Sequence, residues 1–314
     1  MNGFLSGSVW LVLLQSTVRM ATPYTLAAMG GLYSDKAGVS SIELEGILLM
    51  GAFSGFTAAY MTNRLWIGLA AAMISGVLLA AIYGYMVVYL GSKPALVGTA
   101  IVLLATGVTS FFYRSIFGVS VEFPSVDPFQ DIALPVLHKI PVIGTIFFEQ
   151  NILVYLSYLL VIGSWFFYSR TALGLQCRAM GENPYAADTL GLRVRCYRFT
   201  NVLITGAIAG IAGAYLSIAT ASSFVEGISA EKGYAAFAII ILGKYHPIGA
   251  FLGCLLYGFA DALQLNLQAF GINIPYQFML MLPYIFTLIV MFLTGSGNKP
   301  EGHGVFFKKG AQLG

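Results

Sequence analysis

Residues 65–92 read LWIGLAAAMISGVLLAAIYGYMVVYLGS and contain no Asp, Glu, Lys or Arg. A helix needs about 20 consecutive, mostly apolar residues to cross the hydrocarbon core of a membrane, so this stretch is long enough for one span. Stretches free of these four residue types also occupy 1–18, 46–63, 94–113, 150–169, 199–225, 245–260 and 262–298. A barrel strand has only about 10 residues, which alternate between polar and apolar. The pattern therefore predicts an all-α, polytopic transmembrane helical bundle with about 8–10 membrane-spanning helices, including broken or re-entrant ones.

The composition also indicates a membrane protein. Of the 314 residues, 58% are apolar and 9% are charged, and the mean hydropathy is +0.82. A soluble domain has about 25% charged residues, so a cytosolic globular enzyme is excluded. Low charge and only three cysteines also exclude a disordered chain and a small disulfide-rich scaffold. We expect residues 1–314 to form a single transmembrane domain, with residues 1–30 in the mature chain because no cation precedes Arg19.

The cations orient the predicted spans. Residues 170–198 contain five arginines and belong in the cytoplasm by the positive-inside rule. Counting spans from this cytoplasmic loop places residues 114–149 in an extracytoplasmic loop, with the N-terminus outside and the C-terminus inside. The weakest predicted span is 226–243, because only eleven residues separate Lys232 from Lys244. A tilted, broken or re-entrant helix is expected there. If this segment does not cross the membrane, the number of crossings changes by one and the C-terminus lies on the opposite side of the membrane.

Glycines indicate irregular backbone in one region and close helix packing in three others. Between Ser34 and Gly46 they interrupt an apolar sequence that also holds acidic residues. Irregular backbone at membrane depth has to be surrounded by protein or water. Glycines four residues apart permit close approach of helices, and such pairs occur at Gly51 and Gly55, Gly206 and Gly210, and Gly249 and Gly253. We expect these pairs to be packing surfaces within the bundle.

Motifs of the common catalytic sites are missing from the sequence. No Gly-x-x-x-x-Gly-Lys-Ser/Thr is present, so the chain is not expected to hydrolyse ATP by itself. His138, His246 and His303 are far apart and no His-Glu-x-x-His occurs, which argues against a zinc site. No catalytic residue and no metal ligand are therefore predicted. No disulfide is expected either, because Cys177 and Cys196 fall in the reducing cytoplasmic loop and the third cysteine falls in a span.

Polar residues inside or beside the spans are candidates for contact with a transported solute. An ionisable side chain at bilayer depth costs about 2.5 to 3.5 kcal/mol on insertion scales and usually faces a cavity or a partner. The candidates for the translocation path are Arg19, Glu43, Glu45, Asn201 and Asp261. Each also has a structural alternative: a snorkelling cation, an acidic residue at a helix start, or a hydrogen bond between helices.

A short helix is predicted within the cytoplasmic loop. Asn183 is a favoured N-cap, Pro184 suits the first helical position, and Gly191 suits a left-handed C-terminal cap. A helix of two turns is unstable alone in water. Either it docks on another surface in a functional role, or it is an ordinary capped helix of a loop.

Several stretches together carry a family resemblance. They are GENPYAADTLG at 181–191, RMATPYTLAAMGGLYS at 19–34, IELEGILLMGAF at 42–53, KGYAAFA at 232–238, GKYHPIG at 243–249 and QFMLMLPY at 277–284. They resemble the permease subunits of ABC transporters of the nucleoside-uptake branch, which are related to the ribose and branched-chain amino-acid permeases. The resemblance runs from residue 19 to residue 284, nearly the whole chain.

Two departures from the family pattern lie near the expected translocation path. The family's Asn-x-Gly-x-Glu-Gly appears here as Ser41-Ile42-Glu43-Leu44-Glu45-Gly46. Its Gly-Arg/Lys-Gly-Phe appears as Glu231-Lys232-Gly233-Tyr234. Both departures bear on which solute is carried.

The resemblance implies a subunit of an ATP-driven importer in the cytoplasmic membrane that translocates a small polar solute, with nucleosides first and sugars such as ribose or amino acids as alternatives. It implies a second permease subunit, similar or identical, a cytoplasmic ATPase subunit that binds ATP and Mg²⁺, and an extracytoplasmic substrate-binding protein. Membrane lipid surrounds the chain, which is expected to bind no cofactor and no nucleic acid. The coupling residues implied are Gly181, Glu182, Asn183, Pro184, Ala186, Ala187 and Gly191.

Two rival functions come from other classes. An ion-coupled secondary transporter would use Glu43, Glu45 or Asp261 as titrating carriers and would need no ATPase. A membrane-embedded enzyme would form product without partners.

Overall fold

The computed structural model describes residues 7–118, 124–133, 143–269, 277–278, 281–294 and 299–308. Its long helices are α1 (Gly7–Lys36), α2 (Leu44–Thr62), α3 (Leu65–Gly84), α4 (Pro94–Phe117), α6 (Ile152–Arg170), α9 (Val194–Ala214) and α11 (Pro247–Ala269). Shorter helices are α5 (Ile143–Phe148), α7 (Ala172–Glu182), α8 (Pro184–Thr189), α10 (Lys232–Leu242) and α13 (Leu282–Thr294). Two π-helical segments, Tyr85–Tyr89 and Tyr215–Thr220, extend α3 and α9.

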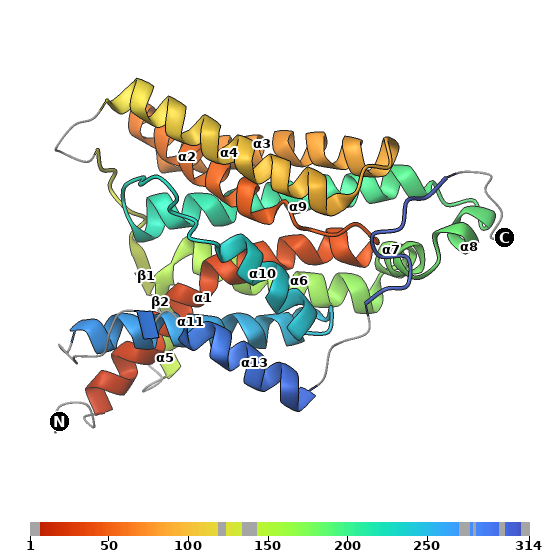
Figure 1. Cartoon of the computed structure of the whole chain (residues 1–314). Coiled ribbons are helices and arrows are strands. Elements are labelled where there is room, and N and C mark those ends of the chain that lie inside the picture. The colour runs from red at the N-terminus through yellow and green to blue at the C-terminus, as the bar shows by residue number, and fades with distance from the viewer. Residues whose placement is uncertain are drawn as a thin grey trace.

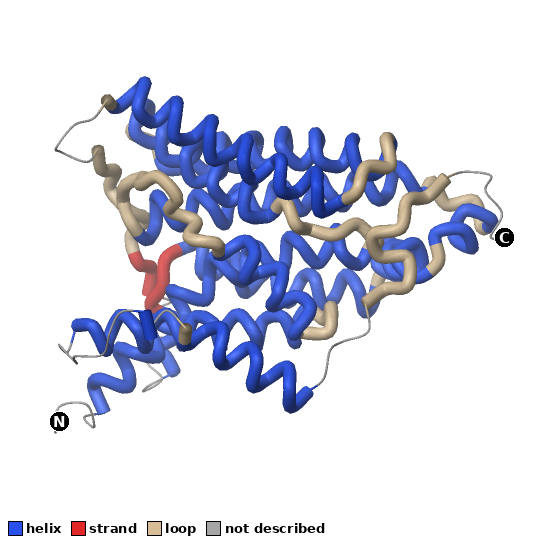
Figure 2. The backbone as a smooth tube through the Cα atoms, in the orientation of Figure 1, coloured by secondary structure: helices blue, strands red, loops and turns tan. Residues whose placement is uncertain are grey.

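The helices lie roughly side by side in one elongated bundle (Figures 1 and 2). Six of the described helices are long and apolar enough to cross a membrane, and α1 has 30 residues with a more polar sequence. The prediction of an all-α transmembrane bundle is confirmed. The described strands are β1 (Asp131–Ala133) and β2 (Glu149–Asn151), which pair antiparallel. Strand β1 lies within the predicted extracytoplasmic loop, and β2 begins at its last residue.

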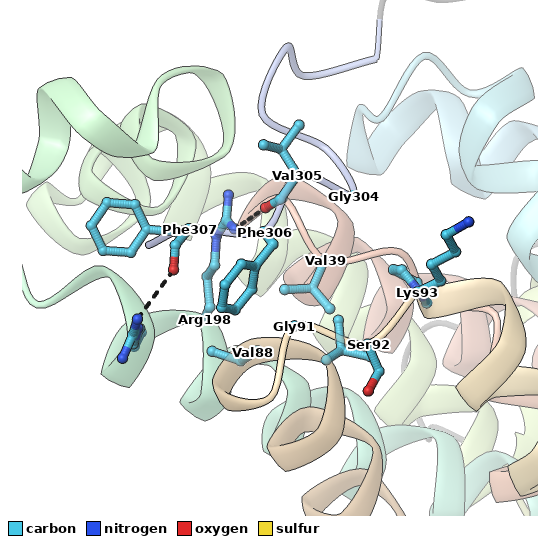
Figure 3. Close-up of a pocket in the computed structure, with 14 residues that line it drawn as sticks. Val39, Val88, Gly91, Ser92, Lys93, Arg198, Gly304, Val305, Phe306 and Phe307 are labelled. Atoms are coloured by element: carbon cyan, nitrogen blue, oxygen red, sulfur yellow. Dashed lines mark hydrogen bonds between the residues drawn. The ribbon is translucent and has the colours of Figure 1, made fainter. Parts of the chain in front are cut away.

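The chain distributes its loops between the two ends of the bundle as the charge count predicts. At one end lie α7, α8, the connection 37–43 and the segment 299–308 (Figure 1). Lys93 lines the same cavity as Arg198 at this end (Figure 3). At the other end, Arg114 pairs with Glu226 and Arg19 pairs with Asp131. The arginine-rich loop and the described part of the 114–149 loop are therefore at opposite ends of the bundle. We call these the cytoplasmic and extracytoplasmic ends, after the sides that the charge count predicts for them.

Close packing of α2, α3 and α9 depends on glycines. A methyl group added at Gly51 of α2 would lie 2.4 Å from the carbonyl oxygen of Gly210 in α9. One added at Gly76 of α3 would lie 2.2 Å from the carbonyl oxygen of Gly206. Real Cβ atoms do not approach an oxygen so closely, so the backbones touch only because these side chains are absent. The predicted packing role of the Gly51 and Gly206 pairs is confirmed.

Replacing Gly76 by Ala is expected to lower the yield and thermal stability of the folded chain in detergent. Overpacking of a tight interface costs about 1–3 kcal/mol, and the obstacle here is rigid backbone. The matched control is Gly107→Ala in α4, where the added methyl group has no atom within 4 Å and alanine favours the helix by about 1 kcal/mol. Fluorescence-detected size exclusion after heating measures both variants. Equal stability of the two variants would contradict this account of the interface.

The weakest predicted span is a half-length helix. Helix α10 has 11 residues, which at 1.5 Å per residue is about half of the roughly 30 Å hydrocarbon core. Its N-terminus meets the start of α2, where the Glu45 carboxylate accepts hydrogen bonds from the backbone N–H groups of Glu231 (3.2 Å) and Gly233 (2.8 Å) and from the hydroxyl of Ser229. An acidic group is favourable at the positive end of a helix. The expectation of a broken or re-entrant element at 226–243 is confirmed as a short helix.

The irregular backbone predicted between Ser34 and Gly46 is confined to a shorter segment. Helix α1 continues to Lys36, and the non-helical connection 37–43 is almost entirely buried in protein. The carboxylate of Asp35, which is fully buried, accepts hydrogen bonds from the backbone N–H (3.2 Å) and hydroxyl (2.7 Å) of Ser41. Protein thus supplies the partners that lipid cannot provide.

Candidate functional site

The short cytoplasmic helix forms as its caps predict. Helix α8 begins at Pro184, and the Asn183 side chain accepts a hydrogen bond from the Ala186 N–H at 3.0 Å. Gly191 has φ of +83°, the left-handed conformation that glycine adopts at low cost. The predicted helix is confirmed, with its last helical residue at Thr189.

The seven residues proposed for coupling divide into two groups. Gly181, Pro184 and Ala187 are buried, whereas Glu182, Asn183, Ala186 and Gly191 are exposed. Leu190, which the sequence analysis did not single out, is 80% exposed. Leu190 is the residue that directly follows α8, so its side chain adds apolar surface beside the exposed residues of the helix. The outward surface is therefore Glu182, Asn183, Ala186, Leu190 and Gly191, and the buried group holds it in place.

The inner side of α8 packs on a small cluster formed partly by the C-terminal segment 299–308, which we call the strap. The cluster contains Met180, Ala187, Val194 and Phe307. The ring of Phe307 lies 5.2 Å from that of Tyr185. This cluster is the docking surface that a helix too short to be stable alone requires.

The strap also joins α7 to the segment that follows α1. The N–H of Gly302 donates to the carbonyl of Gly181 (2.8 Å), and the N–H of Gly304 donates to that of Gly38 (2.9 Å). His303 Nε2 lies 2.9 Å from the carboxylate of buried Asp35. The strap therefore bridges two segments that are far apart in the sequence.

Arg198 of α9 is the centre of this junction (Figure 3). It is 3% exposed, and its guanidinium donates to backbone carbonyls of three segments. Nε donates to Ala37 (3.0 Å), Nη1 to Val305 (2.7 Å), and Nη2 to Gly302 (3.2 Å) and Met180 (3.4 Å). The sequence analysis counted Arg198 only as one of the loop cations. No spacing could have revealed its role, because backbone carbonyls leave no signature in the sequence.

Two cysteines at the cytoplasmic end have contrasting environments. Cys177 is 2% exposed, and its Sγ lies 3.8 Å from the side-chain oxygen of Asn201. Burial raises the pKa of the Cys177 thiol to about 12. Cys196 is exposed. Only the thiolate reacts readily with electrophiles, so the two thiols should differ sharply in reactivity.

A membrane-impermeant maleimide is expected to modify Cys196 in inside-out vesicles and to leave Cys177 unmodified. Cys177 should stay unmodified when the pH is raised from 7 to 9, since its thiol stays protonated until the pH approaches its raised pKa. Mass spectrometry of the labelled peptides gives both rates, and Cys196→Ser is the control. Labelling of Cys196 only in right-side-out vesicles would contradict the orientation.

Four of the five translocation-path candidates, Arg19, Glu45, Asn201 and Asp261, make hydrogen bonds within or between elements. Arg19 bonds Gln150 (3.0 Å) and Asp131 at the extracytoplasmic end. Asn201 donates to the carbonyl of Tyr197 within α9 at 2.8 Å, and Glu45 caps α10 as described above. These bonds match the structural alternatives, and the path assignment of these residues stays a prediction.

Glu43 and Asp261 have different surroundings. Glu43 is fully buried, and among the described residues neither of its carboxyl oxygens has a hydrogen-bond partner. Asp261 of α11 accepts a hydrogen bond from the Tyr24 hydroxyl (2.8 Å) and pairs with Lys232 (3.3 Å). Asp261 also lines a cavity of about 250 Å³ between α1, α10, α11 and α13. Asn201 lines a separate cavity beside α7 and α9.

Comparison with known proteins supports this reading of the fold. Residues 13–294 match the model of the family described as "Branched-chain amino acid transport system / permease component". The chain is 34% identical to the guanosine ABC transporter permease protein NupQ of Bacillus subtilis over 95% of this chain and 97% of the relative. It is 34% identical to the nucleoside ABC transporter permease protein NupC of Lactococcus lactis over 92% and 94% of the two chains.

The name of a third relative contains a different solute, glucose. The putative glucose ABC transporter permease protein TsgC13 of Haloferax volcanii is 35% identical over 83% of this chain and 79% of the relative. All three relatives are named as permease proteins of ABC transporters, and the family match covers most of the chain. The chain therefore belongs to the family of permease components of branched-chain amino acid transport systems, and it is a multi-pass ABC transporter permease subunit of the cell membrane.

Proposed function

We propose that this chain is the permease subunit of an ATP-driven importer whose solute is a nucleoside. The names of two relatives that match it over more than nine tenths of their length support this solute. The observation that carries the proposal is the firmly seated helix α8, which presents Ala186 outward at the cytoplasmic end and is followed by exposed Leu190, while Ala187 and Phe307 anchor it.

The assembly we propose contains four kinds of component. This chain pairs with a second permease subunit, and a cytoplasmic ATPase subunit supplies ATP and Mg²⁺ binding. An extracytoplasmic binding protein delivers the solute. Two relatives from one organism, NupP and NupQ of Bacillus subtilis, are both named guanosine permeases, which favours a pair of different chains.

Coupling follows from the contacts at the cytoplasmic end. A groove of the ATPase would hold the outward surface of α8, so that nucleotide-driven closure moves α7 and α8 together. The buried contacts of Gly181 and Ala187 would pass this movement to the strap and α9 rather than dissipate it in a mobile loop. Two discrete packings of the bundle then correspond to access from each side of the membrane.

The test is uptake of radiolabelled guanosine and uridine by cells with and without this subunit. Uptake that requires the subunit and stops on ATP depletion supports the proposal. Equal uptake in the two strains contradicts it, and uptake that survives ATP depletion but collapses with the ion gradient favours a secondary transporter using Glu43, Glu45 or Asp261. Glucose is the comparison solute, because one relative is named for it.

A further inference from the structure

The cavity beside Asp261 combines groups that apolar helices do not need for packing. It is lined by Tyr24, Lys232, Tyr257, Asp261, Gln264 and Tyr284, among others. Its volume of about 250 Å³ is close to the lower limit of about 300 Å³ for small-molecule sites. The cavity is therefore suited to one small solute.

Three of these side chains form a closed hydrogen-bonding network. The Tyr24 hydroxyl donates to Asp261 Oδ2 at 2.8 Å. The Lys232 ammonium lies 3.2 Å from the same hydroxyl and 3.3 Å from the same carboxylate oxygen. The side chains of Lys232 and Asp261 remain 21% and 16% exposed, so the charges balance each other while keeping access to the cavity. A balanced ion pair favours a neutral polar solute over an ion.

An exclusively structural role explains this network poorly. A partly desolvated ion pair stabilises a fold little better than apolar residues of the same size, and charged groups at membrane depth are costly. The pair also lies at the first residue of α10, the half-length helix. Interrupted helices in membranes place their ends where a cavity rather than lipid adjoins the backbone.

The aromatic side chains narrow the class of solute. The rings of Tyr24 and Tyr257 lie 5.6 Å apart with their planes at 54°, and Tyr284 is 54% exposed. Stacking of a base on an aromatic side chain contributes about 1–3 kcal/mol. The Asp261 carboxylate can accept from ribose hydroxyls or from N–H groups of the base, and the Gln264 amide can donate and accept. An aromatic ring joined to a polyol fits this set of groups.

We infer that Tyr24, Lys232 and Asp261, with the neighbouring tyrosines, form a nucleoside contact site on the translocation path. This inference rests on the proposed function and adds a specificity-determining site within the membrane. The permease then discriminates between nucleosides after the binding protein has released them. The site is distinct from the coupling surface, which lies at the cytoplasmic end (Figure 1).

The test uses the full transporter in proteoliposomes with an unaltered binding protein, and it measures guanosine and uridine uptake beside ATP hydrolysis. Asp261→Asn is expected to reduce uptake at least about tenfold, as loss of a hydrogen bond to a charged group predicts, and to change the guanosine-to-uridine ratio. Stimulation of ATP hydrolysis by the loaded binding protein should stay within about twofold, because coupling contacts are untouched. Asp127→Asn, an exposed carboxylate of the extracytoplasmic loop, is the matched control.

Exchanging the charges of Lys232 and Asp261 distinguishes a role in contacting the solute from a purely structural role of the ion pair. The double variant Lys232→Asp with Asp261→Lys restores the ion pair with reversed polarity, so a purely structural pair would regain uptake. We expect uptake to stay low, because the carboxylate and the ammonium then face the solute from exchanged positions. Recovery in the exchange variant, or an unchanged solute ratio in Asp261→Asn, overturns the contact site alone. Absence of nucleoside uptake by the wild-type transporter overturns the proposed function and this inference together.

Discussion

Replacing Arg198 by Met is expected to reduce uptake at least about tenfold while leaving the chain in the membrane, since each buried carbonyl that loses its donor costs about 1–3 kcal/mol. Four carbonyls from three segments share this one guanidinium. Methionine fills a similar volume without any donor, so the strap loses the two hydrogen bonds that Arg198 donates to Gly302 and Val305. The bond from Arg195 to the Phe307 carbonyl (3.5 Å) remains, and the connection 37–43 loses the bond from Arg198 to Ala37. Movement of α7 and α8 would then no longer reach α1.

Two measurements distinguish this loss of coupling from general unfolding. Hydrogen exchange of the amides of Gly302 and Gly304, which are hydrogen-bonded in the structure, should become at least about tenfold faster in the variant while the spans stay protected. ATP hydrolysis by the assembled transporter should continue with little transport. Arg170→Met is the control, because Arg170 ends α6 at the same side of the membrane and is exposed. A protected strap together with normal uptake would show that Arg198 does not couple the two segments.

Replacing Ala186 by Glu is expected to abolish uptake through the partner surface rather than through the fold. Ala186 is exposed on α8, so a longer charged side chain needs no rearrangement within this chain but obstructs any protein seated against the helix. The chain should insert and keep its thermal stability, whereas the ATPase subunit should no longer co-purify. Binding loss of about 3 kcal/mol, or about a hundredfold in affinity, is typical of an altered interface centre.

The structure separates Ala186 from its neighbour, although the sequence treats the two alanines alike. Ala187 is 2% exposed among Met180, Val194 and Phe307, so Ala187→Glu buries a charge and should destabilise the cytoplasmic end itself. Ala95→Glu provides the control for charge, because Ala95 is exposed in the first turn of α4, where an acidic group is favourable. Undiminished uptake with Ala186→Glu would rule out α8 as the contact with the ATPase.

Much of the fold could be predicted from the sequence because its causes are local. Stretches without charge reveal spans wherever lipid is the solvent, and the arginines of 170–198 orient them. The cap of α8 needs only Asn183, Pro184 and Gly191, which act within a few residues of one another. The short α10 follows from the close spacing of Lys232 and Lys244, which leaves too few apolar residues for a full crossing.

The candidate site was predicted less completely. The position of a polar residue along a predicted span indicates its depth in the membrane but not which side chains of other helices lie beside it. Arg19, Glu45, Asn201 and Asp261 all had the right polarity for a path, and the structure gives each of them a hydrogen-bond partner within the protein. The network around Asp261 could not be predicted, because it forms only where α1 and α10 bring Tyr24 and Lys232 next to this residue.

By itself, then, the sequence determined the membrane-spanning class and the capped helix α8, and it predicted the orientation, since hydrophobicity, charge and capping act over a few residues. Only the tertiary structure decided that Arg198 holds the strap, that Ala187 faces inward and Ala186 outward, and that Asp261 opens on a cavity. Those features depend on backbone carbonyls and side chains separated by more than a hundred residues. Packing brings them together, and no short-range pattern encodes which of them meet.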